Sequence, residues 1–443
     1  MELMTPQPKK PGGGAVGPQE DEAQATLFGT QKKPAASSRI ERIRARRRAR
    51  RIRIAALCVL ALAGVLAYFT GLYGASLSLL GDVYDSVSIA LTPGPGFPTG
   101  FSLSGFVTAK PFAGGFVAVG DKDVAIVAAN GNEVRRVQHT YSRPSVAVGN
   151  TRVCIYNRSG TELLVESRSK NLFQHTFQEA IELCAMSPNG TLAVFTKSAL
   201  NVYDPMFENI FSFQSSEKPT AMAFAADNRQ FAVGCVAGEG GALGGTVYLF
   251  TTDPDAPAEA TAVIHNAEGL PLKIFYPTNK LVLVVYDTAC VLYNAADGSE
   301  MARYDYGGHE LQSADLSDGG NDLVLLFGDG IHSSQTRLLV LETANLSQVG
   351  RAQVGRVAKG LAATRTGAYV LTANGALCYS LAGELLDEAA VSGKTLAVVA
   401  AKKPLLLMDG SVQELAQPGA QKASSSAPPA AMAEEPASTS PAA

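Results

Sequence analysis

The chain has 443 residues and a formal net charge of −3, but its charges are unevenly placed. Nine arginines fall between Arg39 and Arg53, with Glu41 as the one acidic residue among them, and this leaves 28 basic and 39 acidic residues elsewhere. The rest of the chain is therefore near −11, which argues against a nucleic-acid-binding groove.

Both ends of the chain are predicted to be disordered tails. Residues 1–38 are rich in Pro, Gly, Gln and Lys, and residues 416–443 are rich in Ala, Ser and Pro. Such segments bury too little apolar surface to offset the entropy that a chain loses on folding. The basic segment 39–53 joins the first tail to the rest of the chain.

A hydrophobic segment over residues 54–80 is predicted to cross a membrane. Its first twenty residues, Ile54 to Tyr73, contain no charge, and at about 1.5 Å per residue they span about 30 Å, the thickness of the hydrocarbon core. Nine of the twenty are Leu, Val, Ile or Phe, which favours insertion by about 3 to 5 kcal/mol. The alternative is a buried helix of a soluble domain, but such helices rarely run this long without a polar face.

The charges that flank this segment predict its orientation in the cell membrane. Arginines precede it, whereas no basic residue occurs between its end and Lys110, and cytoplasmic flanks accumulate Lys and Arg. The N-terminus is therefore expected in the cytoplasm, and the segment is expected to be an uncleaved signal anchor because no good cleavage site follows it. The arginines would also contact anionic lipid. The topology determinants are Arg46, Arg47, Arg48, Arg50, Arg51 and Arg53.

After a predicted spacer over residues 81–104, the sequence becomes a series of short apolar strands separated by turns. The hydrophobic period is two, which is typical of strands. One unit recurs, an apolar strand that ends in a large residue, then a polar turn and a second strand. Eight copies are found, spaced about 40 residues apart on average. Their strand-ending residues are Val127, Tyr156, Tyr203, Phe250, Tyr293, Leu341, Tyr379 and Leu407.

A second set of turns, including SPNG at 187 and AADN at 225, precedes another strand in most units. Two hairpins per unit make four strands, and a four-stranded unit at this spacing is typical of a β-propeller blade. The sequence therefore predicts an all-β domain over residues 105–415, a β-propeller with eight blades or, as the alternative, seven. The second and eighth copies are short, and the strand near residues 103–109 is a candidate to complete one of them.

Two stretches are distinctive, SRPSVAVGNTRVCIYNRSGTELLVESRSKNLFQHTF at 142–177 and AMSPNGTLAVFTKS at 185–198. Together with the basic stretch and the anchor, they make the chain resemble a family of membrane-anchored propeller proteins from Gram-positive anaerobic bacteria that is known only as a domain of unknown function. The resemblance covers about residues 40–415 and implies an extracytoplasmic propeller with WD40-like or quinoprotein-like repeats. It implies no activity, ligand or catalytic residue.

No residue can be assigned from the sequence to catalysis, to a cofactor or to a metal. The five cysteines beyond the anchor lie singly in or beside apolar strands, and the five histidines lack metal-ligand spacing. The stretch GEGGALGG at 238–245 lacks the Lys-Ser/Thr of a phosphate loop and is expected to form a long, flexible hairpin. The stretch DLSDGGND at 315–322 lacks the Glu of a calcium loop and falls in register with the turns of other units.

These observations favour a non-catalytic binding or scaffold module of the bacterial cell envelope, with an envelope protein or a cell-wall glycan as its partner. An envelope glycan-acting hydrolase or lyase is the alternative, and a quinoprotein-like redox enzyme is less favoured. Because sites are usually built on loops between rigid strands, contacts are expected at Gly238–Gly245, Asp253–Glu259 and Gly328–Gln335. The candidate contact residues are Gly238, Gly240, Gly241, Gly244, Gly245, Asp253, Asp255, Asp329 and His332.

Overall fold

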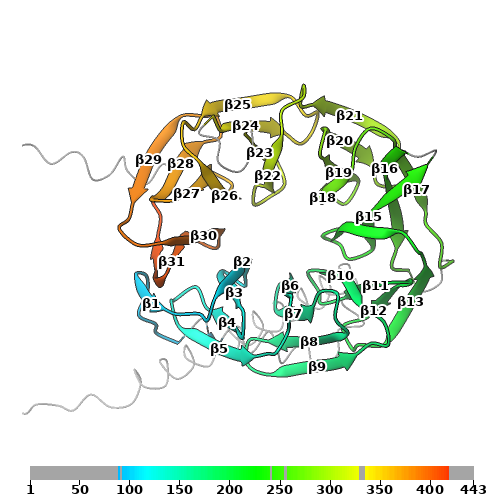
Figure 1. The fold of residues 1–443 in the computed structure, drawn as a ribbon, viewed down its shortest axis with the longest axis horizontal. Coiled ribbons are helices and arrows are strands. Elements are labelled where there is room, and N and C mark those ends of the chain that lie inside the picture. The colour runs from blue at the N-terminus through cyan, green and yellow to red at the C-terminus, as the bar shows by residue number, and fades with distance from the viewer. Residues whose placement is uncertain (1–87, 90–91, 240–241, 254–256, 329–334, 419–443) are drawn as a thin grey trace, which may run out of the picture. The chain divides into compact units, whose positions relative to one another are not determined.

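The computed structural model describes residues 88–89, 92–239, 242–253, 257–328 and 335–418. The described residues form 32 strands, which pair into eight four-stranded antiparallel sheets. The sheets are arranged radially around a central channel as the blades of a propeller (Figure 1). The predicted all-β propeller is confirmed, and the blade number is eight rather than seven.

The strands of the first four blades follow one another from the channel outward. Blade 1 is β2 (Phe106–Phe112), β3 (Gly115–Gly120), β4 (Asp123–Val127) and β5 (Glu133–Gln138); blade 2 is β6 (Pro144–Val148), β7 (Arg152–Asn157), β8 (Glu162–Ser167) and β9 (Asn171–Thr176); blade 3 is β10 (Ile181–Met186), β11 (Leu192–Thr196), β12 (Ala199–Tyr203) and β13 (Asn209–Gln214); blade 4 is β14 (Lys218–Phe224), β15 (Gln230–Glu239), β16 (Ala242–Thr251) and β17 (Ala262–Asn266).

Three of the remaining blades repeat this order, and the eighth takes its outermost strand from the start of the ring. Blade 5 is β18 (Pro271–Thr278), β19 (Leu281–Tyr286), β20 (Ala289–Asn294) and β21 (Glu300–Asp305); blade 6 is β22 (Leu311–Leu316), β23 (Asp322–Phe327), β24 (Arg337–Glu342) and β25 (Gln348–Gln353); blade 7 is β26 (Ala358–Ala363), β27 (Gly367–Thr372), β28 (Gly375–Ser380) and β29 (Leu385–Ala390); blade 8 is β30 (Thr395–Ala400), β31 (Pro404–Met408), β32 (Gly410–Glu414) and β1 (Thr99–Phe101).

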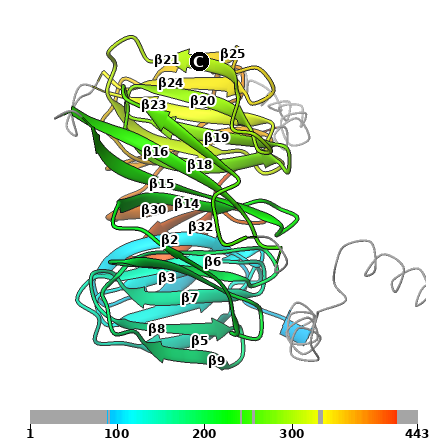
Figure 2. The ribbon, with the colours of Figure 1, turned by 90° about the vertical axis from the view of Figure 1, so that its right-hand side faces the viewer.

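The core lies between neighbouring blades rather than inside any one of them. The middle strands of most blades are largely buried, as β3 and β4 are over their whole length, because each face of the sheet meets another blade. One cluster, for example, joins Val117 and Ile126 of blade 1 to Val153 and Ile155 of blade 2. Burying a side chain of this size contributes about 1.5–3 kcal/mol. Figure 2 shows the stacked blades from the edge of the ring.

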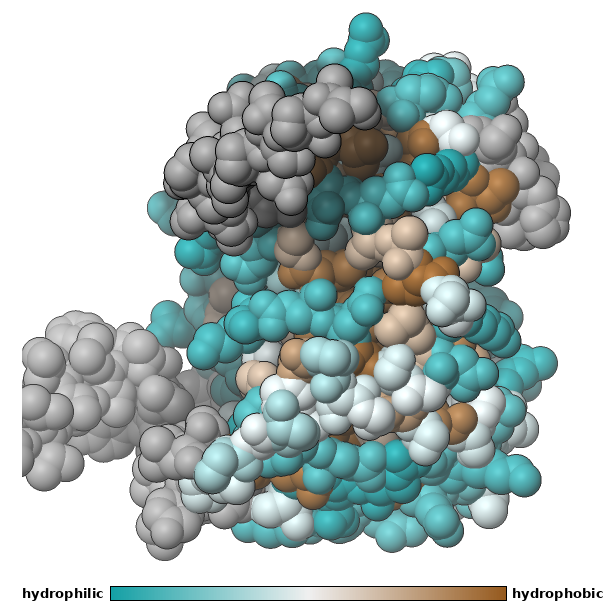
Figure 3. Space-filling model, turned by 90° about the vertical axis from the view of Figure 1, so that its left-hand side faces the viewer, coloured by the Kyte–Doolittle hydropathy of each residue, from teal (hydrophilic) through white to brown (hydrophobic). Residues whose placement is uncertain are grey.

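The outermost strands form a mixed rim. In β5 and β29 exposed residues alternate with half-buried ones, because only one face of these strands packs on the blade behind. The rim keeps some apolar side chains in water, such as Leu385 at 54% exposure. The side view in Figure 3 accordingly shows hydrophilic residues with smaller groups of apolar ones between them.

Strand β1 closes the ring. It pairs with β32, so that the beginning of the propeller completes its last blade, and an edge that would otherwise be bare is covered. The Phe101 ring packs edge to face on Phe116 of blade 1, with the ring centroids 5.4 Å apart. The folded ring therefore begins inside the segment 81–104 that we predicted as a spacer, and the strand near residues 103–109 is the innermost strand of blade 1.

The predicted repeat is confirmed, but its alignment was wrong in two units. Most of the strand-ending residues lie on the third strand of their blade, such as Tyr203 on β12 and Tyr293 on β20. Tyr156 and Leu407 lie instead on β7 and β31, the second strands of blades 2 and 8. In both blades the second strand is apolar and precedes a polar turn, and in blade 8 the third strand, GSVQE, is mostly polar, which explains why the two short copies were misaligned.

The predicted hairpin turns join the first and second strands. Asn228 and Gly190 take φ angles of 62° and 95° there, the left-handed region that Asn and Gly tolerate. These turns all lie on one face of the ring together with the turns between third and fourth strands. The chain enters β1 and leaves β32 at that same face, which we call the entry face. The turns between second and third strands lie on the opposite face.

The distinctive stretch 142–177 holds blades 1, 2 and 3 together through buried polar groups. The Glu166 carboxylate is 2% exposed and accepts hydrogen bonds from Arg135 Nε at 2.5 Å and from Asn171 Nδ2 at 2.9 Å. The Arg152 side chain is 1% exposed, lies 5.6 Å from the ring centre of Phe207, and donates to the Pro205 carbonyl at 2.5 Å. The polar residues of this stretch thus have structural partners.

Candidate functional site

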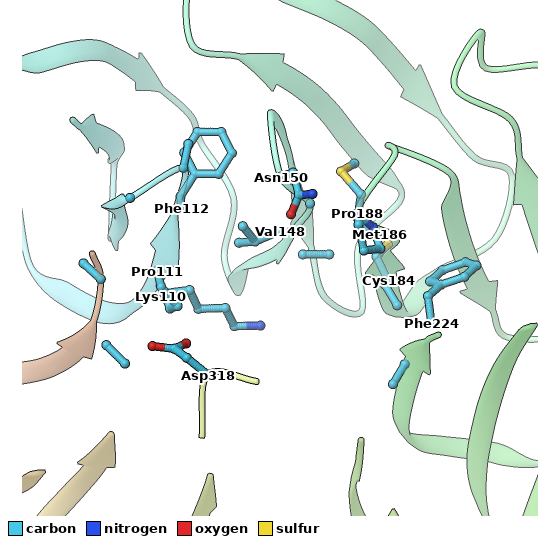
Figure 4. Close-up of a pocket in the computed structure, with 18 of the residues that line it drawn as sticks. Lys110, Pro111, Phe112, Val148, Asn150, Cys184, Met186, Pro188, Phe224 and Asp318 are labelled. Carbon is cyan, nitrogen blue, oxygen red and sulfur yellow. The ribbon is translucent and has the colours of Figure 1, made fainter. Parts of the chain in front are cut away.

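The mouth of the channel on the entry face is the first candidate site. A cavity of about 830 Å³ opens there between the ends of the innermost strands and the turns that follow them. Figure 4 shows polar and apolar side chains from several blades around this opening, including Lys110, Asn150 and Asp318. Its apolar lining includes Phe112, Met186, Met222, Phe224, Pro111 and Pro188.

Charged side chains inside the channel link neighbouring blades. Lys110 of β2 donates from Nζ to the Val146 carbonyl of β6 at 2.9 Å. Four blades further round the ring, Lys273 of β18 donates from Nζ to the Ala314 carbonyl of β22 at 2.6 Å. These contacts satisfy carbonyl groups on the inner edges of the blades, which have no strand to pair with.

An acidic group in the channel links blades in the same way. Asp315 of β22 accepts a hydrogen bond at 2.8 Å from the backbone N–H of Ala363, which lies on β26 of the next blade. The hydroxyl of Thr220 on β14 donates to the Pro271 carbonyl of β18 at 2.5 Å. Each of these side chains therefore ends on the backbone of the following blade.

The enclosure of the channel shifts the pKa values of these groups. Surrounding protein lowers the pKa of Lys110, and the like charge of Lys273 adds to this effect. Burial likewise lowers the pKa of Lys273, which Asp315 partly opposes. Burial raises the pKa of Asp315, against the hydrogen bond from Ala363 and the charge of Lys273. Both lysine side chains are exposed to water in the channel, so solvent moderates their shifts.

The three predicted contact segments belong to two kinds of connection. Gly238–Gly245 and Gly328–Gln335 connect second and third strands, β15 with β16 and β23 with β24, whereas Asp253–Glu259 falls between the third and fourth strands β16 and β17. The first of them is also mostly strand. Gly238, Gly244 and Gly245 lie in the paired strands β15 and β16, whose register runs up to Glu239 and Ala242 and confirms the long hairpin that we expected there.

Several predicted residues lie outside the described residues. They include the candidate contacts Gly240, Gly241, Asp255, Asp329 and His332, the arginines of 39–53 and the segment 54–80. Within the described ranges, no helix has the length and apolar character needed to cross a membrane. The contact role of these residues, the membrane anchor and its orientation all stay predictions.

The cysteines behave as buried apolar residues. Cys154, Cys184, Cys235, Cys290 and Cys378 are free and buried. Burial and a hydrogen bond with Cys154 raise the pKa of the Cys184 thiol well above its ordinary value, which keeps it protonated and unreactive. Over the described part of the chain, no three His, Cys, Asp or Glu side chains gather closely enough to hold a metal ion.

Sequence reasoning missed the channel residues because each is a single charge in a short strand. A signal was present: the stretches FVTAKPF and PLKIFYPT each place one lysine within the innermost strand of its blade. An isolated lysine in such a strand is as typical of a position that faces outward into solvent as of a position inside the channel. The choice between the two depends on which side of the blade the lysine faces, and the order of residues alone does not fix this.

The fold defines the chain as an eight-bladed β-propeller. More particularly, residues 101–404 match the model of a family of unknown function, DUF5711, and the chain belongs to this family. No curated protein matches the chain in sequence.

Among solved structures, the C-terminal WD40 domain of Sif2 is similar at a TM-score of 0.54 and 12% identity, over 72% of this chain and 99% of that domain. The Hsv2p structure from Kluyveromyces lactis has a TM-score of 0.49 and 10% identity, over 65% of this chain and 100% of the other. At these identities, the likeness to the Sif2 domain shows the propeller fold alone.

Proposed function

We propose that the chain is a single-pass membrane protein whose propeller is a non-catalytic binding or scaffold module of the bacterial cell envelope. The apolar segment 54–80 would anchor it in the bilayer, and the arginines before that segment would keep the N-terminus in the cytoplasm. The partner would be an envelope protein or a cell-wall glycan. Neither a cofactor nor a nucleic acid forms part of the proposal.

The observation that supports a non-catalytic role is that the charged groups in the channel are engaged in contacts between blades. Propeller enzymes need acids or bases that converge on the channel and remain available to a substrate. Here Lys110, Lys273 and Asp315 each bond to the backbone of the next blade. Groups held in this way stiffen the ring, and a rigid ring offers a partner a preformed surface.

The entry-face mouth is the surface that we assign to the partner. Its cavity of about 830 Å³ combines apolar side chains with Asn150, Asp318 and Lys402. A mixture of this kind fits a loop of a protein or a short stretch of glycan, because apolar contacts supply affinity and a few polar groups fix the orientation. The chain enters β1 and leaves β32 at this same face.

A photoreactive amino acid at Asn150, within the mouth, tests this assignment in living cells. The matched control carries the same group at Leu385, which is exposed on the rim. We expect a discrete adduct from position 150 and none from position 385. Adducts from the rim alone would move the partner site away from the mouth.

Two further measurements test the rest of the proposal. Protease added to intact, wall-stripped cells should digest the propeller and spare an N-terminal fragment about as long as the tail and the anchor. Protection of the whole chain would contradict the orientation. Turnover of a cell-wall glycan by the purified chain would contradict the non-catalytic role and favour the hydrolase or lyase alternative.

A further inference from the structure

A second cavity lies far from the channel, in the groove between blades 5 and 6. It has a volume of about 370 Å³ and is lined by the outer parts of β21, β24 and β25 together with the connection that follows β21. Its floor is apolar and aromatic, whereas its walls carry nitrogen donors. The lining residues that carry the argument are Tyr304, His309, Phe327, Arg337, Arg351 and Gln353.

Two arginines face the same side of this groove. Arg337 on β24 pairs with Gln353 on β25, and Leu339 pairs with Arg351. Arg337 and Arg351 are therefore diagonal neighbours on one sheet face, with Cα atoms roughly 7–8 Å apart. Both side chains are exposed. At this separation the two long side chains can converge on one ligand.

Arg337 contacts an imidazole rather than a carboxylate. Its Nη1 lies 3.1 Å from Nε2 of His309, and since a guanidinium only donates, the imidazole nitrogen is the acceptor in this contact. Elsewhere on the ring, two other arginines pair with carboxylates: Arg303 of β21 with Glu300 at 3.0 Å, and Arg356, between β25 and β26, with Glu388 at 2.5 Å. None of the described residues that line the 5/6 groove is Asp or Glu.

The equivalent groove between blades 1 and 2 has the same construction and the opposite charge. There the register pairs Glu162 with Thr176 and Leu164 with Gln174, so Glu162 takes the place of Arg337 and Gln174 that of Arg351. The lining of this groove includes Asp121, Asp123 and Glu162, with Lys122 as its one cation among the described residues. The basic character of the 5/6 groove is therefore not a requirement of the fold.

We propose that the groove between blades 5 and 6 binds a phosphate group, free or as an ester. Arg337 and Arg351 supply charge-assisted donors from two neighbouring strands, and Gln353 and Tyr304 add neutral donors beside them. Donors that approach from several sides suit a tetrahedral oxyanion better than a planar carboxylate. The aromatic floor of Tyr304 and Phe327 offers an apolar surface to the organic part of an ester. The body of the chain is acidic, so this groove is a local exception.

Titration of the full-length chain in an uncharged detergent tests the site. The probes are inorganic phosphate, glycerol 3-phosphate and malonate, added at constant ionic strength and followed by calorimetry. We expect phosphate binding to weaken at least about tenfold when Arg337→Gln and Arg351→Gln are combined, because both charge-assisted contacts are lost. The control is Arg356→Gln, which changes an exposed arginine in the connection between blades 6 and 7; this variant should bind phosphate as the unchanged chain does.

Arg337, Arg351, Gln353 and Tyr304 lie at the surface of the groove or on its wall, so the variants should fold. Circular dichroism checks that they do. Tighter binding of glycerol 3-phosphate than of inorganic phosphate supports an ester as the ligand, and the reverse order supports free phosphate. Phosphate binding that persists undiminished in the double variant would overturn the site. So would an absence of phosphate binding, or malonate binding more tightly than both phosphates.

Discussion

The grooves between blades 1 and 2 and between blades 5 and 6 occupy opposite points of the ring and are built from the same strands, yet they differ in charge. Glu162 and Gln174 stand in one where Arg337 and Arg351 stand in the other. Both grooves have a buried leucine between these positions, Leu164 or Leu339. The repeat thus fixes the backbone and the floor of each groove, while its exposed positions remain free to carry function.

The two blade interfaces also differ beneath the grooves. Between blades 1 and 2, Arg135 pairs with the buried carboxylate of Glu166. The equivalent residues of blades 5 and 6 are Ala302 and Leu341, which belong to one apolar cluster. One interface of the ring is therefore held by a charged pair at the place where another is held by apolar packing, and both arrangements fit the same strand geometry.

Breaking the charged pair should have the largest effect on stability. Arg135→Ala leaves the Glu166 carboxylate buried without its cation, and we expect the free energy of unfolding to fall by about 2–4 kcal/mol. The double change Arg135→Ala with Glu166→Leu copies blades 5 and 6 and should recover most of that loss. Chemical denaturation measures both.

The control for this comparison is Arg303→Ala, which removes the exposed pair with Glu300 and should cost less than about 1 kcal/mol. A double variant no more stable than Arg135→Ala would show that the two interfaces are not interchangeable.

Asp123 is expected to make a smaller, pH-dependent contribution to stability that blade 5 lacks, because the equivalent residue there is Ala289. Burial alone would raise the pKa of Asp123, but hydrogen bonds from Ser104 and the charge of Arg136 lower it overall below its ordinary value of 3.8. A lowered folded-state pKa contributes stability that is present above pH 4 or so and is lost as the pH falls through the folded-state value.

Thermal unfolding of the unchanged chain and of Asp123→Asn, followed from pH 6 down to pH 3, tests this. The stability difference between them should shrink on acidification. A stability difference that stays constant over this range would mean that the contacts of Asp123 in the folded ring do not lower its pKa.

The exposed groove charges should have the smallest effect on stability. Glu162→Gln and Arg337→Gln each remove one exposed charge that is outside the core, and each should change the free energy of unfolding by no more than about 0.5 kcal/mol. If both variants have the same denaturation midpoint as the unchanged chain, these charges do not stabilise the ring and remain available for binding. A large loss in either variant would place that charge among the structural ones.

Much of the fold could be predicted from the sequence because every blade repeats the same signals. Apolar strands at about 40-residue spacing and Asn or Gly at turns that need positive φ, such as Asn228 and Gly190, each point to the same architecture. Strand β1 escaped prediction because three residues beside a proline-rich stretch show no periodicity. Its role depends on pairing with β32, more than 300 residues away.

The candidate sites were harder to predict for a different reason. A lone Lys110 or Arg351 in an alternating strand has the appearance of an ordinary solvated residue. Only the register of the blade shows that Lys110 reaches the next blade inside the channel, and that Arg351 lies diagonal to Arg337. Function in this ring depends on which side of a blade a charge faces, and the order of residues alone does not fix this.

The most direct test of the account moves the phosphate site from one groove to the other. Glu162→Arg with Gln174→Arg, added to the chain that carries Arg337→Gln and Arg351→Gln, rebuilds the two arginines between blades 1 and 2 on an equivalent backbone. Calorimetric titration with inorganic phosphate should show binding in the unchanged chain, loss in the 5/6 variant, and recovery in the chain with the transplanted arginines. Undiminished binding in the 5/6 variant, or no recovery after the transplant, would contradict the claim that exposed residues on a common frame set the function of each groove.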